Sequence, residues 1–296
     1  MKNRTWKKTM AVTLGSMMIL SMGTTVSAAS DGDYTKNENV YVALDSEGKV
    51  SGTHVVNIFH VTKEGDIIDY GDYDKVVNLT NLDEIESDKE EHNFYSEEGK
   101  FYYQGDMSDV ELPWLIDIDY YLDDEEMTSE ELAGQSGDFE MHIRVKENPQ
   151  ASHDEYYNNY MLQISVPMDT EVFDNTICEG GVISDAGKNE QVTFVVSPGS
   201  DGNFKITAEV ENFELDSITM NGVQQVYERP KEEGSGEMEP VIVPSFTSSA
   251  NKTVNQVMFL MSTEGIKIPE PSTPEIVENK ESKWKTFKNK LISLFE

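Results

Sequence analysis

The chain has 296 residues, a formal net charge of −33 at pH 7 and one cysteine. A surface this acidic repels nucleic acid and anionic lipid, so we predict no nucleic-acid partner. The length allows one large or two small domains, and a single cysteine excludes a disulfide within the chain.

Residues 1–28 have the pattern of a secretory signal peptide. Four basic residues lie within the first eight positions, an apolar stretch covers 11–22, and Val26-Ser27-Ala28 places small residues where a signal peptidase cleaves. The apolar stretch is shorter than a comfortable membrane span. We therefore predict export with cleavage after Ala28, and loss of the four basic residues takes the charge from −33 to −37.

The predicted location is a bacterial, Gram-positive envelope. Exported eukaryotic proteins of this size usually contain disulfides, which this chain cannot form with Cys178 alone. The lysine-rich start of the signal peptide agrees with a bacterial export route. We predict a protein that is secreted, extracellular or associated with the cell surface.

Residues 29–111 are predicted to form N-terminal β hairpins. Apolar side chains alternate over 40–44 and return over 50–61, after a turn-forming Asp-Ser-Glu-Gly sequence. An aromatic pair at 94–95 and three aromatic residues at 101–103 flank another polar turn, so this stretch is predicted to be a second hairpin.

The clearest pattern lies near the middle of the chain. Apolar and polar side chains alternate over 114–122 and again over 139–145, as in strands with one buried and one wet face. Between them, Thr128 and Glu131 have capping-box spacing, and Gly134 stands where a helix ends. This stretch predicts a strand, one helical turn and a second strand.

Residues 112–268 are predicted to form a β-sandwich region. Further apolar or alternating runs at 160–166, 204–210 and 254–262 are separated by turn signals. About ten short strands of this kind favour an all-β fold, with one or more Ig-like β-sandwich-type domains and short helical turns.

Two shorter signals refine this region. Asn221-Gly222 is a strong hairpin dipeptide, so a turn is predicted there with 223–227 as the return strand. Residues 229–240 have the composition of a flexible loop.

The C-terminal residues differ from the rest of the chain. Residues 269–282 are rich in Pro and Glu and predict a disordered linker, whereas 283–296 predict a basic amphipathic helix. Two interpretations stay open: the helix docks on the acidic body, or it contacts a membrane surface or an envelope protein. The candidate contact residues are Trp284, Phe287, Lys288, Lys290, Leu291 and Phe295.

We find no catalytic constellation in the sequence. Asp117 and Asp119 are spaced like an acid pair, at roughly 6.6 Å along a strand, but the alternation places both on the wet face. No metal-binding histidine spacing, GxSxG or phosphate-binding glycine loop occurs. We therefore predict no enzymatic activity and no catalytic, cofactor or metal residues.

Two acidic segments offer oxygen ligands for weak Ca²⁺ binding. They are Asp123-Asp124-Glu125-Glu126 and the loop 69–74, and neither has EF-hand spacing. Solvated turns are the favoured interpretation, so we predict no resident cofactor.

Tyrosines in polar segments are the best hint of a binding surface. Tyr70, Tyr73, Tyr156 and Tyr157 fall in predicted loops, and tyrosine is common in recognition surfaces. We treat them as candidate ligand-loop residues, next to the alternative that they are surface tyrosines without a role.

Three segments carry a resemblance to a known group. The sequences YYLDDEEMTSEELAGQSGDFEMHIRVKEN, GGVISDAGKNEQVTFVV and VNQVMFLMSTEGIKI are similar to the β-rich extracellular region of clostridial exported envelope proteins related to the phage-infection-protein group. Asp124 replaces the turn glycine of that pattern, and the group's long helical region and membrane spans have no counterpart in this sequence. The resemblance implies an extracellular β module at the envelope and transfers no catalytic residue.

The sequence therefore predicts a non-enzymatic secreted or cell-surface protein that acts in binding, scaffolding or assembly. A secreted hydrolase of cell-wall polymer is one alternative. Peripheral membrane binding through the C-terminal helix is another.

Overall fold

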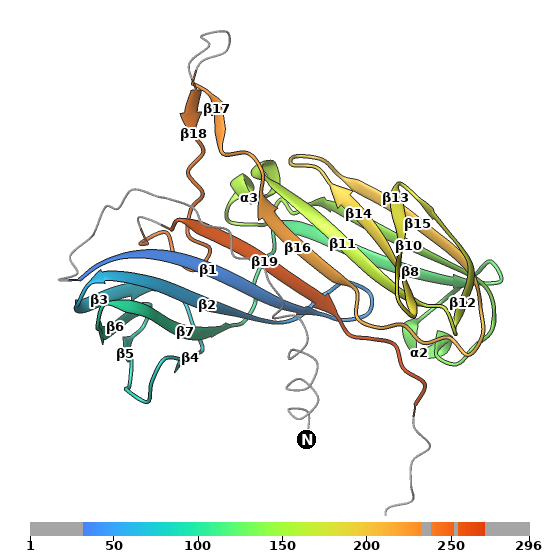
Figure 1. The fold of residues 1–296 in the computed structure, drawn as a ribbon, viewed down its shortest axis with the longest axis horizontal. Helices are drawn as coiled ribbons and strands as arrows, with labels where there is room; N and C mark the ends of the chain where they lie inside the picture. Colours follow the sequence, from blue (N-terminus) through green and yellow to red (C-terminus); the bar gives the residue numbers. More distant parts are fainter. Residues whose placement is uncertain (1–31, 232–237, 252–253, 270–296) are drawn as a thin grey trace, which may run out of the picture.

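The computed structural model describes residues 32–231, 238–251 and 254–269, which form an elongated, strand-rich body (Figure 1). The prediction of an all-β chain with short helical turns is confirmed at this level. The predicted signal peptide, most of the linker and the tail helix at 283–296 lie outside the described residues.

One long sheet runs through the described body. Its strand order places an early and a late strand of the described residues side by side, because β1 pairs in parallel with β19 and antiparallel with β2. Its nine strands in order are β13 (Gly181–Ala186), β14 (Asn189–Val196), β11 (Tyr160–Asp169), β16 (Thr219–Gln224), β19 (Gln256–Thr263), β1 (Asp33–Leu44), β2 (Val50–Lys63), β7 (Gly99–Met107) and β4 (Lys75–Asn78).

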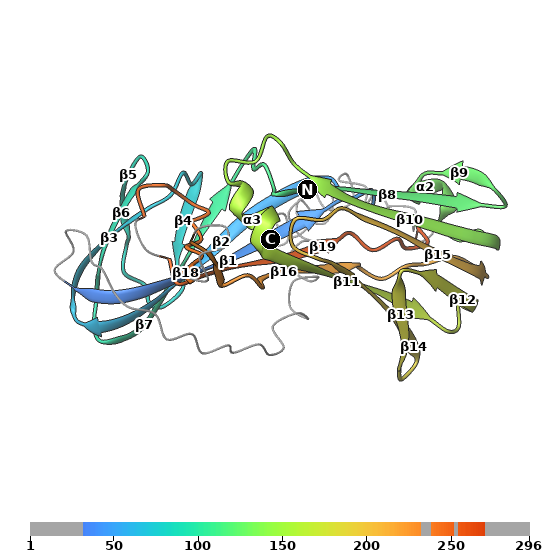
Figure 2. The same cartoon turned by 90° about the horizontal axis from the view of Figure 1, so that it is seen from above.

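Two smaller sheets lie toward opposite ends of this body (Figures 1 and 2). The five-stranded sheet has the order β12 (Phe173–Glu179), β15 (Gly202–Val210), β10 (Gly137–Glu147), β8 (Trp114–Leu122) and β9 (Glu125–Met127). The three-stranded sheet has the order β3 (Gly65–Tyr70), β6 (Glu91–Ser96) and β5 (Glu86–Asp88). The remaining elements are the pair β17 (Glu228–Pro230) and β18 (Met238–Pro240), and helices α2 (Ser129–Leu132) and α3 (Asp154–Asn159).

A large apolar core fills the space between the long sheet and the five-stranded sheet. The alternation of β8 and β10 aims their apolar side chains inward, as the sequence predicts. Trp114 of β8 packs edge-on against Phe259 of β19, with ring centroids 5.2 Å apart. We call this the large core.

A second, smaller core lies under the three-stranded sheet. It is made of buried side chains from β2, β3, β6 and β7: Phe59, Val61, Ile67, Phe94, Phe101 and Tyr103. We call this the small core, and it holds the candidate site described below.

Several local predictions are confirmed. The hairpin β1–β2 forms where the alternation and the turn signal place it. Thr128 and Glu131 form the predicted capping box at α2, and Gly134 follows the helix with φ +78°.

The predicted hairpin at 94–103 is wrong. Strand β6 pairs with β3 and β5, whereas β7 pairs with β2 and β4, so the two strands belong to different sheets. Phe94 and Phe101 stack across the small core with centroids 4.2 Å apart. The aromatic pattern therefore marks two facing sheets rather than two neighbouring strands.

The predicted turn at Asn221-Gly222 is also wrong, because β16 runs straight through both residues. A Cβ atom at Gly222 would lie 2.8 Å from Cη2 of Trp114 and 3.1 Å from Cβ of Phe259. The glycine therefore permits close packing of the indole and not a turn.

Candidate functional site

The outer face of the five-stranded sheet carries the aspartates that the sequence singles out. Asp117 faces Arg144 across β8 and β10, and Asp119 faces His142. Asp119 makes an ion pair with Arg144, and Asp117 makes one with Lys49. Both aspartates are held by cations on a partly exposed surface, which is unlike a buried acid next to an ionised base.

Glu140 belongs to the same face. Its carboxylate is 2.5 Å from Nζ of Lys205 and 2.5 Å from Nε2 of His142. The hydrogen bond from Lys205 holds the pKa of Glu140 below its usual value, with a further contribution from His142 against the opposing effect of burial. These groups form a surface ionic network.

An open groove of about 580 Å³ lies beside this network. Five of its twelve lining residues are acidic, and Ile177, 62 % exposed, adds apolar surface. The other lining residues are Tyr121, Asp123, Asp124, Asp138, Phe139, Glu140, His142, Asn175, Thr207, Ala208 and Glu209. The groove suits a partner with cationic and apolar groups.

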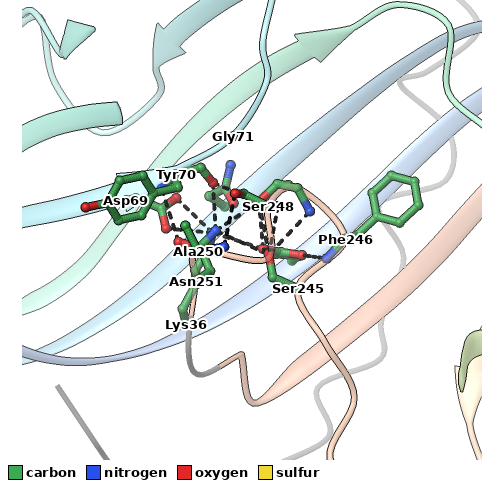
Figure 3. A network of polar contacts seen from close by, with 12 residues as sticks. Lys36, Asp69, Tyr70, Gly71, Ser245, Phe246, Ser248, Ala250 and Asn251 are labelled. Atoms are coloured by element: carbon green, nitrogen blue, oxygen red, sulfur yellow. Dashed lines mark hydrogen bonds and ion pairs between the residues drawn. The ribbon is translucent and has the colours of Figure 1, made fainter. Parts of the chain in front are cut away.

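A cluster of buried charges lies at the small core (Figure 3). Nζ of Lys36 is 2.8 Å from both carboxylate oxygens of Asp69 and 2.9 Å from Oε1 of Glu38. The three side chains are between 0 and 1 % exposed. We call these three residues the Lys36 triad. Charges buried to this degree need close partners, because transfer out of water is costly for each of them.

The second carboxylate of the triad is fixed by a segment far away in sequence. Glu38 accepts hydrogen bonds from Oγ of Ser245 (2.6 Å), the backbone N–H of Phe246 (2.7 Å) and Oγ1 of Thr247 (3.1 Å). These three donors satisfy the hydrogen-bonding needs of the Glu38 carboxylate even without its contact with Lys36.

The segment 245–251 is also hydrogen-bonded to Tyr70, the last residue of β3. Nδ2 of Asn251 donates to the backbone oxygen of Tyr70 at 2.6 Å, and the N–H of Tyr70 donates to Oδ1 of Asn251 at 3.1 Å. The side-chain amide of Asn251 thus bonds both backbone polar groups of Tyr70, as a neighbouring β-strand would. Nearby, Nε2 of His92 is 2.9 Å from the backbone oxygen of Gly71.

Aromatic side chains surround the triad. The Tyr103 hydroxyl donates to Asp69, and Nζ of Lys36 lies 5.8 Å from the ring centroid of Phe59. Burial, together with the charge of Asp69, raises the pKa of Tyr103 well above its ordinary value, so the hydroxyl remains a donor. Burial acts to lower the pKa of Lys36, but Asp69 and Glu38 outweigh it and raise that pKa well above the ordinary lysine value.

The four candidate tyrosines do not form one surface. Tyr156 and Tyr157 lie in α3, not in a loop, and are buried at 1 and 7 % exposure. Their hydroxyls donate to the backbone oxygen of Pro244 and to Asp201. Placing these two residues in a ligand loop was therefore wrong: they pack in the large core.

The other two tyrosines flank the Lys36 triad. Tyr70 is the last residue of β3, and the Tyr73 hydroxyl accepts a hydrogen bond from Nδ2 of Asn57 at 2.8 Å. The acidic segment 69–74, predicted to be a loop, starts with Asp69. The Asp69 carboxylate accepts hydrogen bonds from Lys36 and Tyr103. Among the described residues, no group of three or more His, Cys, Asp or Glu side chains is arranged to hold a metal ion.

Sequence reasoning missed the triad, although the signal was present. Lys36 and Glu38 continue the alternation of Val40 and Val42 toward the N-terminus, so they fall on the buried face of β1. Asp69 likewise follows the buried Ile67 by two positions. Opposite charges in phase with apolar stripes predict a buried ion pair.

The candidate contacts of the C-terminal helix fall on residues outside the described part of the chain. Trp284, Phe287, Lys288, Lys290, Leu291 and Phe295 therefore remain sequence predictions.

Comparisons with family models and with curated proteins give no match. Among solved structures, the chain is similar to the Fcho1 Mu homology domain of Danio rerio with bound Eps15 peptide, at 11 % identity over 78 % of this chain and 93 % of that one, with a TM-score of 0.40. The yeast delta-COP-I mu-homology domain gives 8 % identity over 81 and 98 %, with a TM-score of 0.35.

A third similar structure is the collagen binding domain of the Erysipelothrix rhusiopathiae surface protein RspB. The identity is 12 % over 76 % of this chain and 93 % of that one, with a TM-score of 0.15. Scores this low do not establish a shared fold, so the function is argued from the residues of this chain.

Proposed function

We propose that the chain is an exported, non-enzymatic protein that binds or scaffolds a partner in a Gram-positive cell envelope. The observation that carries the binding role is the acidic groove on the outer face of the five-stranded sheet. The export role rests on the signal-peptide pattern of residues 1–28. The resemblance to the extracellular region of clostridial envelope proteins supports the same location.

The groove offers the physical basis for recognition. Asp123, Asp124, Asp138 and Glu209 line it, and Tyr121 adds an aromatic ring. A cationic protein segment with apolar side chains would gain charge pairing at the rim and burial against this lining. The strong negative charge of the chain would also attract such a partner over long range.

The wall-hydrolase alternative has less support. Its best acid pair, Asp117 and Asp119, is engaged by Lys49 and Arg144 on a partly exposed surface. An assay for release of soluble fragments from purified cell wall tests it directly. Release that disappears in an Asp117→Asn/Asp119→Asn variant would replace the binding proposal.

Export is tested by expressing the tagged full chain in a Gram-positive host. We expect the product in the medium or wall fraction, with an N-terminus at Ala29 by N-terminal sequencing. A matched control carries Leu14→Arg and Leu20→Arg, which interrupt the apolar stretch of the signal. Cytosolic retention of the unaltered chain with its first residues intact would contradict export.

Binding is tested by co-sedimentation with purified envelope fragments at low and high salt. Asp123→Asn/Asp124→Asn removes two groove charges, and asparagine tolerates the positive φ angles of 52° and 66° found there. Glu97→Gln/Glu98→Gln makes the same charge change at the distant turn before β7. We expect the groove variant to lose binding and the control to keep it, whereas equal losses would refute a role for the groove.

Membrane-surface binding through 283–296 remains the second alternative. In the described residues, helices are too short and too polar to cross a bilayer. Flotation with anionic liposomes, with and without residues 283–296, tests the tail. If both forms stay in solution at low salt, the tail does not bind membranes.

A further inference from the structure

The Lys36 triad brings an amine to a carboxyl group in a site without contact to bulk water. Nζ of Lys36 is equally close, at 2.8 Å, to both oxygens of Asp69. Both side chains are 1 % exposed. Lys36 lies on β1 of the long sheet and Asp69 on β3 of the three-stranded sheet, so a bond between them would join two sheets.

Glu38 is placed to move protons for this pair. Oε1 is 2.9 Å from Nζ of Lys36, and Ser245, Phe246 and Thr247 hold the carboxylate in one orientation. The Tyr103 hydroxyl donates to Oδ2 of Asp69 and would stabilise negative charge on that oxygen during attack at the carboxyl carbon. Every polar group needed for an acyl transfer is thus provided by the chain itself.

We propose that Lys36 and Asp69 condense to form an isopeptide cross-link, with Glu38 as the proton-transfer group. The reaction begins when a proton passes from the ammonium to the carboxylate, giving a neutral amine and a carboxylic acid. Nζ attacks Cγ of Asp69, and the Nζ–Cγ bond forms. Glu38 takes a proton from the nitrogen and returns it to Oδ1, the Cγ–Oδ1 bond breaks, and one water molecule leaves.

The balance of this step is complete. An ammonium and a carboxylate become one amide and one water, Glu38 ends as it began, and no oxidant or co-reactant takes part. The neighbouring carboxylates favour the ammonium form of Lys36, so internal proton transfer must precede the attack. The product removes two of three buried charges, and the remaining carboxylate of Glu38 keeps its three hydrogen-bond donors from residues 245–247.

The surroundings suit condensation over hydrolysis. Phe59, Phe94 and Tyr103 are at most 7 % exposed and close the site to bulk water. Once the water product has left, the amide faces aromatic rings and the satisfied Glu38. The link would close the chain between residues 36 and 69 and resist separation of β1 from β3, which suits a protein exposed to force or proteases outside the cell.

Mass spectrometry of the intact full chain tests the cross-link. We expect a mass lower than the sequence mass by about 18 Da, the mass of one water. Tryptic mapping should place this loss in one branched species that joins the Lys36 and Asp69 peptides, without cleavage after Lys36. A water loss that maps elsewhere, or a folded chain at full sequence mass, would overturn the proposal and leave the triad as an ion pair.

Three variants assign the roles. Lys36→Arg should have the full sequence mass, and Glu38→Gln should be at least tenfold less cross-linked than the unaltered chain. Asp69→Asn keeps the shape of the acceptor and should lose ammonia, about 17 Da, in place of water. Lys49→Arg, which alters an exposed lysine paired with Asp117, is the matched control and should be cross-linked fully.

Unaltered cross-linking in Glu38→Gln would refute the role of Glu38 while keeping the bond. The mass of the unaltered chain tests the cross-link by itself, so the test holds even where a variant fails to fold.

Discussion

The large and small cores are stabilised by different means. The large core is filled by apolar side chains from alternating strands, with rings such as Trp114 and Phe259 in edge-on contact. The small core combines an aromatic wall with three buried charges. Apolar packing tolerates many sequences of similar volume, whereas a buried charge requires a particular partner at hydrogen-bond distance. The stability of the small core therefore depends more strongly on single residues than that of the large core does.

The largest expected effect lies in the large core. Phe259→Ala removes a ring in contact with Trp114, Tyr156 and Tyr160, so the free energy of unfolding should fall by about 3–5 kcal/mol. Chemical denaturation measures it. Val182→Ala, at a side chain that is 67 % exposed, is the control and should change little. Equal effects of the two substitutions would show that Phe259 is not part of a packed core.

The charged triad should respond differently from the apolar core. Asp69→Leu leaves Lys36 with one carboxylate and should lower the free energy of unfolding by roughly 3–5 kcal/mol. Adding Lys36→Met and Glu38→Gln removes the two charges that remain and should restore about 1–4 kcal/mol of that loss. Neither variant can form the proposed cross-link, so their difference reports the buried charges alone. A further loss in the triple variant would show that the small core does not depend on charge pairing.

A smaller effect separates packing from turn formation at Gly222. Gly222→Ala should lower the free energy of unfolding by about 1–3 kcal/mol, because the new methyl group would meet Trp114 at 2.8 Å. Combining it with Trp114→Phe should relieve part of the cost, as denaturation of the single and double variants would show. A neutral Gly222→Ala substitution would mean that the indole does not press on β16.

The sequence predicted the large core better than the small one. The alternation over 114–122 and 139–145 is strict, so it predicted both the strands and their buried faces. The capping box at Thr128 needs only local contacts, and it too was predictable. Pairing between distant strands, such as β1 with β19, is not encoded in any local pattern.

The candidate site was hidden for a related physical reason. Lys36 and Asp69 are 33 positions apart, and Ser245 approaches Glu38 from more than 200 positions away. Because a charged residue is usually solvated, its position on the buried face of a strand is not expected from its residue type. The small core also brings β6 and β7 face to face, an arrangement that a single turn between two aromatic runs does not reveal.

The smallest expected effect concerns pH, and it distinguishes surface charges from buried ones. The pKa of Glu140 is lowered in the folded state, so its stabilising contribution is full above the unfolded value of 4.5 and is lost as pH falls through the lower folded value. Because the carboxylate is partly solvated, we expect less than about 1 kcal/mol. Glu140→Gln should therefore flatten the fall of the melting temperature between about pH 6 and about pH 3.

The Lys36 side chain contributes to stability in the alkaline range instead, if its amine still titrates. The pKa of Lys36 is raised, so its contribution is full below 10.5 and is lost only as pH rises through the higher folded value. In a cross-linked chain this alkaline loss disappears, because the amide does not titrate. Melting curves of the unaltered chain and of Glu38→Gln at alkaline pH therefore compare the two states. An alkaline loss of equal size in both would show that the lysine of the unaltered chain remains free.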